Sequence, residues 1–163
     1  MSWRNLEVVH VVAVDQQHCI GRDNQMAWHI PADFKHFREI TQGGVVVMGR
    51  KTFESIVSII GKPLPDRTNI ILTRQADYRA PDGVFVYTSL DKILEDFKDK
   101  ELWSIGGGEI YKETLPYADK LFLTEVHQAV PGDAFFPEFD KNSWHETERE
   151  DKDGYSFVTY QKI

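Results

Sequence analysis

Apolar runs rich in valine, isoleucine and aromatic residues recur along the chain. They are LEVVHVVAV (residues 6–14), VVVM (45–48), NIILT (69–73), VFVY (84–87), LWSI (102–105) and KLFLTEV (120–126). Continuous runs of this kind suit strands that are buried on both faces, and most are separated by segments that suit helices. The pattern predicts an α/β fold with a largely parallel sheet and helices on each side.

Helix start signals lie between these runs. The predicted helices begin near Pro31, after Gly49, at SLDKILEDFKD (89–99) with Ser89 as the N-cap, and after Gly108. The tail, residues 144–163, differs because two strand-like runs flank Asp153 and Gly154, which indicates an antiparallel hairpin at the sheet edge. No repeat or linker interrupts the chain, so residues 1–163 are predicted to form a single domain.

Composition narrows the function classes. The 26 acidic residues outnumber the 19 lysines and arginines, which gives a net charge of -7 and argues against a general nucleic-acid binder. Cys19 is the only cysteine, and the longest apolar runs are too short to span a bilayer. These features predict a cytoplasmic protein without nucleic-acid or membrane partners.

The stretch AWHIPADFKHF (27–37) places one carboxylate among apolar neighbours. In a helix that starts at Pro31, Asp33 shares a face with Ile30, Phe37 and Ile40. One interpretation is structural, because an anion in the first turn meets the positive end of the helix dipole. The other is that Asp33 is a functional carboxylate, and this segment alone does not decide between them.

Two strand-to-helix junctions suit phosphate. In VVVMGRKTFESI (45–56), a helix begins directly after Gly49, beside Arg50, Lys51 and Thr52, and LWSIGGGEIY (102–111) repeats the arrangement with three glycines. Each could instead be a tight turn, and the usual G-x-G-x-x-G fingerprint is absent. Two such junctions in one parallel sheet favour a dinucleotide.

Basic residues near these junctions bear on the choice of dinucleotide. Arg50, Lys51 and Arg74 offer cations for a 2'-phosphate, so NADPH is favoured over NADH, although any one of them alone could be an ordinary surface charge. The histidines show no spacing typical of a metal site, and His10, within an apolar run, is predicted to be a hydrogen-bonded core or edge residue.

Five segments, taken in order, closely resemble bacterial dihydrofolate reductases over essentially the whole chain. They are GRDNQMAWHIPADFKHF (21–37), VVVMGRKTFESI (45–56), KPLPDRTNIIL (62–72), IGGGEIY (105–111) and FLTEV (122–126). The resemblance implies a mainly parallel eight-stranded sheet with four flanking helices. It also implies a monomer that transfers a hydride from NADPH to C6 of 7,8-dihydrofolate, while water protonates N5.

The resemblance also implies roles for individual residues. Asp33 would bind the pterin's 2-amino group and N3, with Thr124 as its partner and Trp28 holding a water, and Arg67 would bind the substrate's α-carboxylate. The residues implied at the reacting centre are Asp33, Trp28, Met26 and Thr124. Those implied in substrate binding are Val11, Asp33, Phe37, Ile56, Arg67, Ile105 and Thr124.

The cofactor site implied by the resemblance is longer. Its residues would be Val12, Ala13, Ile20, Gly21, Gly49, Arg50, Lys51, Thr52, Leu72, Thr73, Arg74, Ile105, Gly106, Gly107, Gly108, Glu109, Ile110 and Tyr111. Ile20 and Tyr111 would flank the nicotinamide, and the loop from Ile20 to Trp28 would be a mobile lid.

Some positions depart from the family pattern. Ala27 stands where a proline is usual, Gln17 and His18 resemble an insertion, residues 57–60 lengthen the segment before GKPLP, and Glu109 replaces a basic residue. Two other functions remain open at this point. They are a pyrimidine reductase of the riboflavin pathway, in which Asp33 and Arg67 would lose their roles, and a nucleotide-binding module without catalysis.

Overall fold

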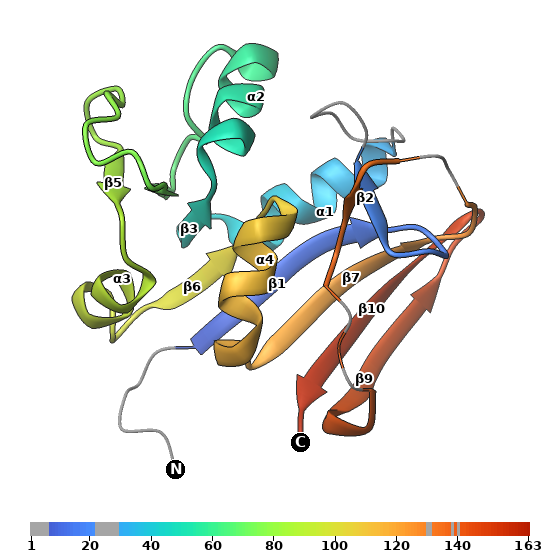
Figure 1. The fold of residues 1–163 in the computed structure, drawn as a ribbon. Coiled ribbons are helices and arrows are strands. Elements are labelled where there is room, and N and C mark those ends of the chain that lie inside the picture. The colour runs from blue at the N-terminus through green and yellow to red at the C-terminus, as the bar shows by residue number, and fades with distance from the viewer. Residues whose placement is uncertain (1–6, 22–29, 130–131, 138, 140) are drawn as a thin grey trace.

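The computed structural model describes residues 7–21, 30–129, 132–137, 139 and 141–163. Its main sheet has eight strands in the order β5-β4-β3-β6-β1-β7-β10-β9 (Figure 1). The strands are β1 (Glu7–Val14), β3 (Val45–Met48), β4 (Thr68–Leu72), β5 (Phe85–Tyr87), β6 (Glu101–Ser104), β7 (Lys120–Val126), β9 (Trp144–Asp151) and β10 (Tyr155–Lys162). All pairs are parallel except β7 with β10 and β10 with β9. The predicted sheet and its antiparallel C-terminal hairpin are confirmed.

A second, two-stranded sheet pairs β2 (Cys19–Gly21) with β8 (Ala134–Phe135). The sequence did not predict it, because strands of three and two residues are too short to show a hydrophobic period.

Four helices flank the main sheet: α1 (Pro31–Thr41), α2 (Arg50–Ile60), α3 (Leu90–Asp96) and α4 (Gly108–Thr114). Two short 3-10 turns, η1 (Leu115–Tyr117) and η2 (Lys141–Ser143), complete the described elements. The predicted start signals are confirmed, since Pro31 opens α1 and the Ser89 side chain accepts a hydrogen bond from Lys92 N. Residues 57–60 form the last turn of α2, so the lengthened segment extends this helix before it ends at Gly61, whose φ of 79° suits glycine.

The helices cover the two faces of the sheet in pairs (Figure 1). Apolar residues of α1 and α2, among them Phe37 and Phe53, pack with Val9 and Val11 of β1 on one face. Residues of α3 and α4 pack with Val8, Val12 and their neighbours on the other face. Successive side chains of β1 therefore enter two separate cores, as a strand buried on both sides requires.

The chain changes direction between β3 and β6, which are neighbours in the sheet. After β3 the chain passes through α2 to β4 on one side, whereas after β6 it passes through α4 to β7 on the other. In open parallel sheets, ligands bind outside the carboxyl ends of strands at such a point. No helix in the described part of the chain is long and apolar enough to cross a membrane.

Candidate active site

Asp33 lies in the first turn of α1 and on the face of the helix that meets the sheet. Ile30, Asp33, Phe37 and Ile40 are each partly buried, as their shared helical face predicts, and Lys35 is exposed. The N-cap residue, Ile30, offers no side-chain cap. Asp33 can therefore favour the helix end electrostatically and also point toward the strands, so the two interpretations of this residue are compatible.

Thr124 of β7 holds the carboxylate. Its Oγ1 donates a hydrogen bond to Asp33 Oδ1 at 2.5 Å, and the threonine is only 3% exposed. Burial raises the pKa of Asp33, while the bond from Thr124 and the charge of His36 act in the opposite direction. The structure thus brings together two residues that are 91 positions apart in the chain.

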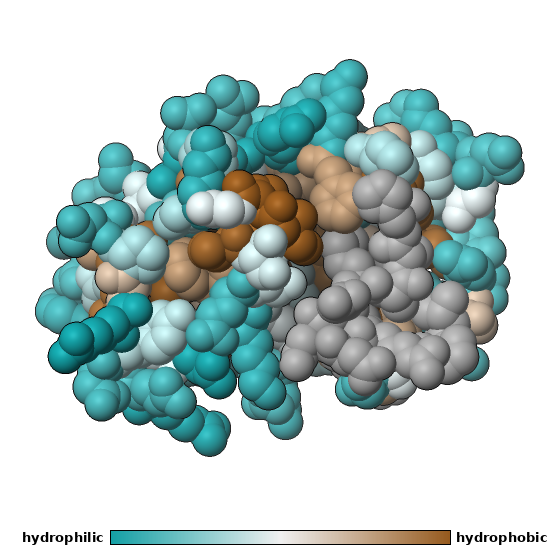
Figure 2. Space-filling view, turned by 90° about the horizontal axis from the view of Figure 1, so that it is seen from above, coloured by the Kyte–Doolittle hydropathy of each residue, from teal (hydrophilic) through white to brown (hydrophobic). Residues whose placement is uncertain are grey.

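Apolar residues predicted for the substrate site gather beside Asp33. Val11, Phe37, Ile56 and Ile105 belong to one cluster between α1, α2 and the sheet. Leu64 joins them, and we call these five residues the α1–α2 cluster. Figure 2, which looks onto the side that is uppermost in Figure 1, shows apolar surface between hydrophilic margins.

The sequence interpretation missed Leu64. The side chain of Asn69 holds the loop, because its Oδ1 accepts from Leu64 N at 3.2 Å and its Nδ2 donates to Leu64 O at 3.0 Å. The available signal was an asparagine at the start of an apolar strand, five residues after a leucine between two prolines.

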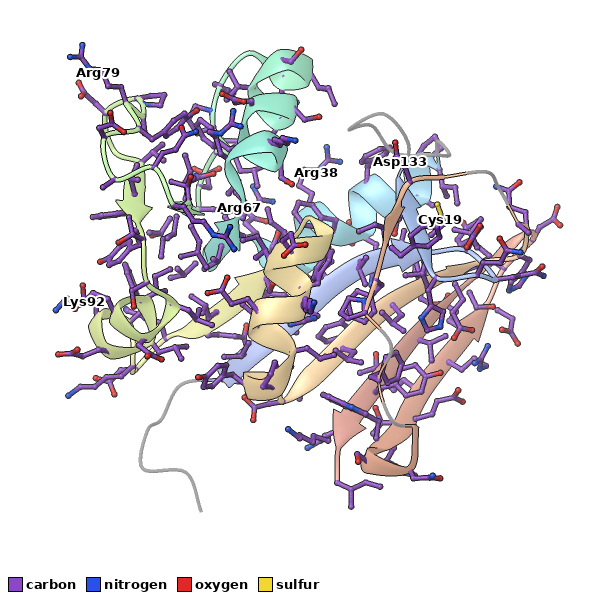
Figure 3. The ribbon with its side chains drawn as sticks, in the orientation of Figure 1. Cys19, Arg38, Arg67, Arg79, Lys92 and Asp133 are labelled. Carbon is purple, nitrogen blue, oxygen red and sulfur yellow. The ribbon has the colours of Figure 1, made fainter. Side chains whose placement is uncertain are left out.

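Arg67, just before β4, lies near Arg38 of α1 (Figure 3). Its Nε donates to Thr41 Oγ1 at 2.9 Å, Nη1 to Pro65 O at 2.7 Å and Nη2 to Arg38 O at 2.9 Å. The guanidinium also lies 6.0 Å from the centre of the Phe37 ring. Three bonds fix the plane of the group, and they do not use the second N–H of either terminal nitrogen.

The Arg67 pKa is lowered by burial, but an arginine keeps its charge. Thr41, which helps to position Arg67, was not predicted as a site residue. Its sequence signal is weak, because a threonine in a helix commonly donates a hydrogen bond to the backbone carbonyl four residues earlier. Thr41 does so here, to Phe37 O.

The two glycine junctions lie side by side. Gly49 N donates to Gly106 O at 2.9 Å, which links the turn after β3 to the turn after β6. Gly106 has a φ of 109°, and a Cβ there would come within 2.9 Å of the Tyr111 ring, so glycine is required. A Cβ on Gly107, in contrast, would meet only Thr52 Oγ1, at 3.8 Å, among the described atoms.

Helix α2 starts at this place without a side-chain cap. Its first backbone N–H groups and the Thr52 hydroxyl therefore suit an anion, with Arg50 and Lys51 in the same turn. Thr73 and Arg74 follow β4, the neighbour of β3, so the predicted basic residues share one edge of the sheet. Arg50 is paired with Glu54 at 2.7 Å.

The other predicted cofactor residues lie on several elements of the fold. Ala13 lies on the same side of β1 as Val11, Ile20 and Gly21 belong to β2, and Gly108 and Glu109 open α4. The remaining side chains are 7% exposed or less and pack in the α3–α4 core, namely those of Val12, Leu72, Ile110 and Tyr111. Tyr111 supports the site from beneath, because its hydroxyl donates to Val11 O at 2.7 Å.

Met26, Trp28, Ala27 and most of the predicted lid lie outside the described residues. Glu109 is exposed in the first turn of α4. Within the described residues, no group of three or more His, Cys, Asp or Glu side chains is placed to hold a metal ion.

Comparisons with known proteins agree with this geometry. Residues 7–162 match the dihydrofolate reductase family. The chain is 40% identical over 164 residues to the dihydrofolate reductase of Bacillus subtilis, covering 93% of this chain and 92% of the relative. It is 47% identical over 135 residues to that of Haemophilus influenzae, covering 82% and 81%.

A solved structure of dihydrofolate reductase from Enterococcus faecalis, complexed with NADP(H) and RAB-propyl, superimposes with a TM-score of 0.85. The two chains are 33% identical, and the match covers 96% of each. Sequence family, curated relatives and fold thus lead to one conclusion. The chain belongs to the dihydrofolate reductase family.

Proposed function

We propose that this protein reduces 7,8-dihydrofolate to 5,6,7,8-tetrahydrofolate with NADPH, and that Asp33 binds the 2-amino group and N3 of the pterin. The observation that carries the proposal is a partly buried carboxylate, bound to Thr124, at the edge of the α1–α2 cluster. A carboxylate has two acceptor oxygens that suit two neighbouring N–H donors, and the cluster offers apolar contact to a flat ring.

The paired glycine turns fit NADPH. The open space at Gly107, the N–H groups at the start of α2 and the Thr52 hydroxyl suit the pyrophosphate and a neighbouring phosphate. Arg50, Lys51 and Arg74 supply positive charge for the 2'-phosphate. When bound, NADPH supplies the hydride that adds to C6.

The protein's own contribution is alignment and control of charge. Asp33 fixes the orientation of the pterin, and burial raises the pKa of its carboxyl. Water delivers the proton to N5. Arg67 binds the α-carboxylate of the substrate's glutamate through the N–H groups that its structural bonds do not use.

The proposal includes a monomeric, one-domain enzyme that acts in the cytoplasm. A sequence with a single cysteine, which cannot form an intramolecular disulfide, supports this compartment.

An absorbance assay that follows NADPH oxidation tests the proposed function. Dihydrofolate should be reduced, and the ribityl-phosphate pyrimidine substrate of riboflavin synthesis should not. Oxidation with the pyrimidine alone would assign the chain to the other reductase. Tight NADPH binding without turnover of either compound would leave only a nucleotide-binding module.

A further inference from the structure

His36 lies one helical turn after Asp33 on α1, and its ring stacks on Phe157. The ring centroids are 4.2 Å apart and the planes are inclined by 22°. Phe157 belongs to β10, where its Cα pairs with that of Thr124 in β7. The two helix residues thus meet two paired strand residues: Thr124 binds Asp33, and Phe157 stacks with His36.

This arrangement fixes a titratable ring beside the Asp33 carboxylate. Residues three apart on a helix are surface neighbours, and the stack on Phe157 limits the rotation of the imidazole. Histidine is the side chain whose charge ordinarily changes between about pH 5 and pH 8. A protonated imidazole at this place puts a positive charge next to Asp33.

We propose that His36 is a positioning residue for the reduction. Phe157 holds its ring in place, and the charge of the ring controls how readily Asp33 keeps a proton. The inference rests on the proposed function, in which Asp33 binds the pterin. Protonated His36 favours the carboxylate form of Asp33, and this electrostatic effect is lost when His36 is neutral.

Other groups around this pair do not supply the same switch. Besides this pair, the titratable groups of α1 are Lys35, Arg38 and Glu39. On the face of the hairpin that carries Phe157, they are Glu148 and Glu150 of β9 and Tyr155 of β10, all of which are exposed except Tyr155, and Tyr111 of α4 is affected by Asp33. Lys35 and Glu39 are exposed and lie within 4.0 Å of each other, and Glu150 is exposed and bound to Lys152 at 2.6 Å. The Tyr111 pKa is raised by burial and by Asp33, so this tyrosine stays neutral.

Three substitutions separate charge from packing. His36→Phe keeps an aromatic ring against Phe157 and removes the charge, His36→Gln removes both, and His36→Arg makes the charge permanent while retaining a planar group that can stack. His145→Gln is the matched control, because His145 is an exposed histidine of β9. Circular dichroism establishes that each variant is folded.

The decisive measurement is the titration of the Asp33 carboxyl by carbon-13 NMR in protein without substrate, which does not depend on turnover. The midpoint of this titration should lie at higher pH in His36→Phe and His36→Gln than in the wild type. It should be equal or lower in His36→Arg, and it should be unchanged in His145→Gln. Single-turnover oxidation of NADPH with dihydrofolate should follow the same order. In the pH range where this rate declines as pH rises, it should change about twofold when the Asp33 midpoint moves by about 0.3 on the pH scale.

Equal Asp33 midpoints in the wild type and all three His36 variants would overturn the inference and leave His36 as a packing residue. A change in midpoint that follows loss of the ring and not the charge, with His36→Phe and His36→Arg both unchanged, would overturn it as well. If the wild type does not reduce dihydrofolate, the proposed function fails, but the NMR titration still decides whether His36 controls the charge of Asp33.

Discussion

Asp33, which is partly buried, and His10, which is fully buried, are ionisable side chains that each lie beside a threonine, on opposite faces of the sheet. Asp33 accepts from Thr124 on the face of α1 and α2. His10 Nε2 lies 2.8 Å from Thr114 Oγ1, and its ring packs against Tyr111 and Phe136 on the face of α3 and α4. Burial favours the neutral form of each group, so it raises the pKa of Asp33 and lowers that of His10 to about 3.

Access separates the two sites. His10 is completely buried, and Thr114 also bonds Ile110 O and the hydroxyl of Ser104, so the network ties α4 to β1 and β6. Asp33 keeps part of its surface exposed beside an apolar cluster. A shifted pKa therefore marks a functional site only where a ligand can reach the group, and the sequence expectation of a core role for His10 is confirmed.

The two groups also act oppositely on stability. Folded Asp33 binds its proton more tightly than the unfolded chain does, so its contribution to the unfolding free energy decreases as pH rises from the unfolded pKa, 3.8, through the folded pKa. Folded His10 binds its proton less tightly, so its contribution decreases as pH falls below the unfolded pKa, 6.5.

The largest effect is expected at Asp33, the one of the two ionisable residues that a ligand can reach. Asp33→Asn keeps the shape but removes the charge, so the hydride-transfer rate at neutral pH should fall by about 10²- to 10⁴-fold. Binding of NADPH should be retained, part of the rate should return at low pH with substrate that is already protonated, and the wild-type pH dependence should disappear. Single-turnover NADPH oxidation across pH avoids interference from product release. A near-normal rate with an intact pH profile would make Asp33 a helix-end residue only.

His10→Leu tests the inaccessible member. Because the neutral leucine cannot bind a proton on unfolding, the wild type should lose about 2 to 3 kcal/mol more unfolding free energy than the variant between pH 7 and pH 4.5, given the His10 pKa of about 3. Urea unfolding at both pH values measures this difference, and His145→Leu, at an exposed histidine, is the control. Equal pH dependence in wild type and His10→Leu would contradict the lowered pKa.

Arg67→Ala tests the residue that is proposed to bind the α-carboxylate of the substrate. Loss of charge-assisted bonds of about 1.5 to 3 kcal/mol should weaken dihydrofolate binding about 10- to 100-fold. A pterin without the glutamate tail should bind wild type and variant alike. If both ligands lose affinity equally, the bonds of Arg67 to Thr41, Pro65 and Arg38 matter for the loop and not for the carboxylate.

The smallest expected effect concerns cofactor choice. Arg50→Ala should reduce the preference for NADPH over NADH by about tenfold, less than a full charge-assisted bond gives, because Arg50 also pairs with Glu54 and Lys51 and Arg74 lie near the same sheet edge. The ratio of kcat/KM with the two cofactors measures it. Glu54→Ala is a matched control that frees Arg50 and should not reduce the preference. Equal loss with both cofactors would show that Arg50 does not recognise the 2'-phosphate.

Much of the fold was predictable because its signals are local. Apolar runs, Pro31, Ser89 and the turn at Gly154 each report on a few neighbouring residues, and the strands, helix starts and hairpin follow from them. The strands β2 and β8 escaped because pairing between short segments, and not their own pattern, creates them.

The sequence by itself determined the candidates for the site: a lone carboxylate on an apolar helix face, two glycine junctions and a few basic residues. Only the tertiary structure decided which of them meet. The bond from Thr124 to Asp33, the bond from Gly49 to Gly106 and the stack of His36 on Phe157 join residues far apart in the chain. Such contacts depend on strand order and on which face each helix covers, and burial depends on all the packed neighbours at once, so no local pattern encodes them.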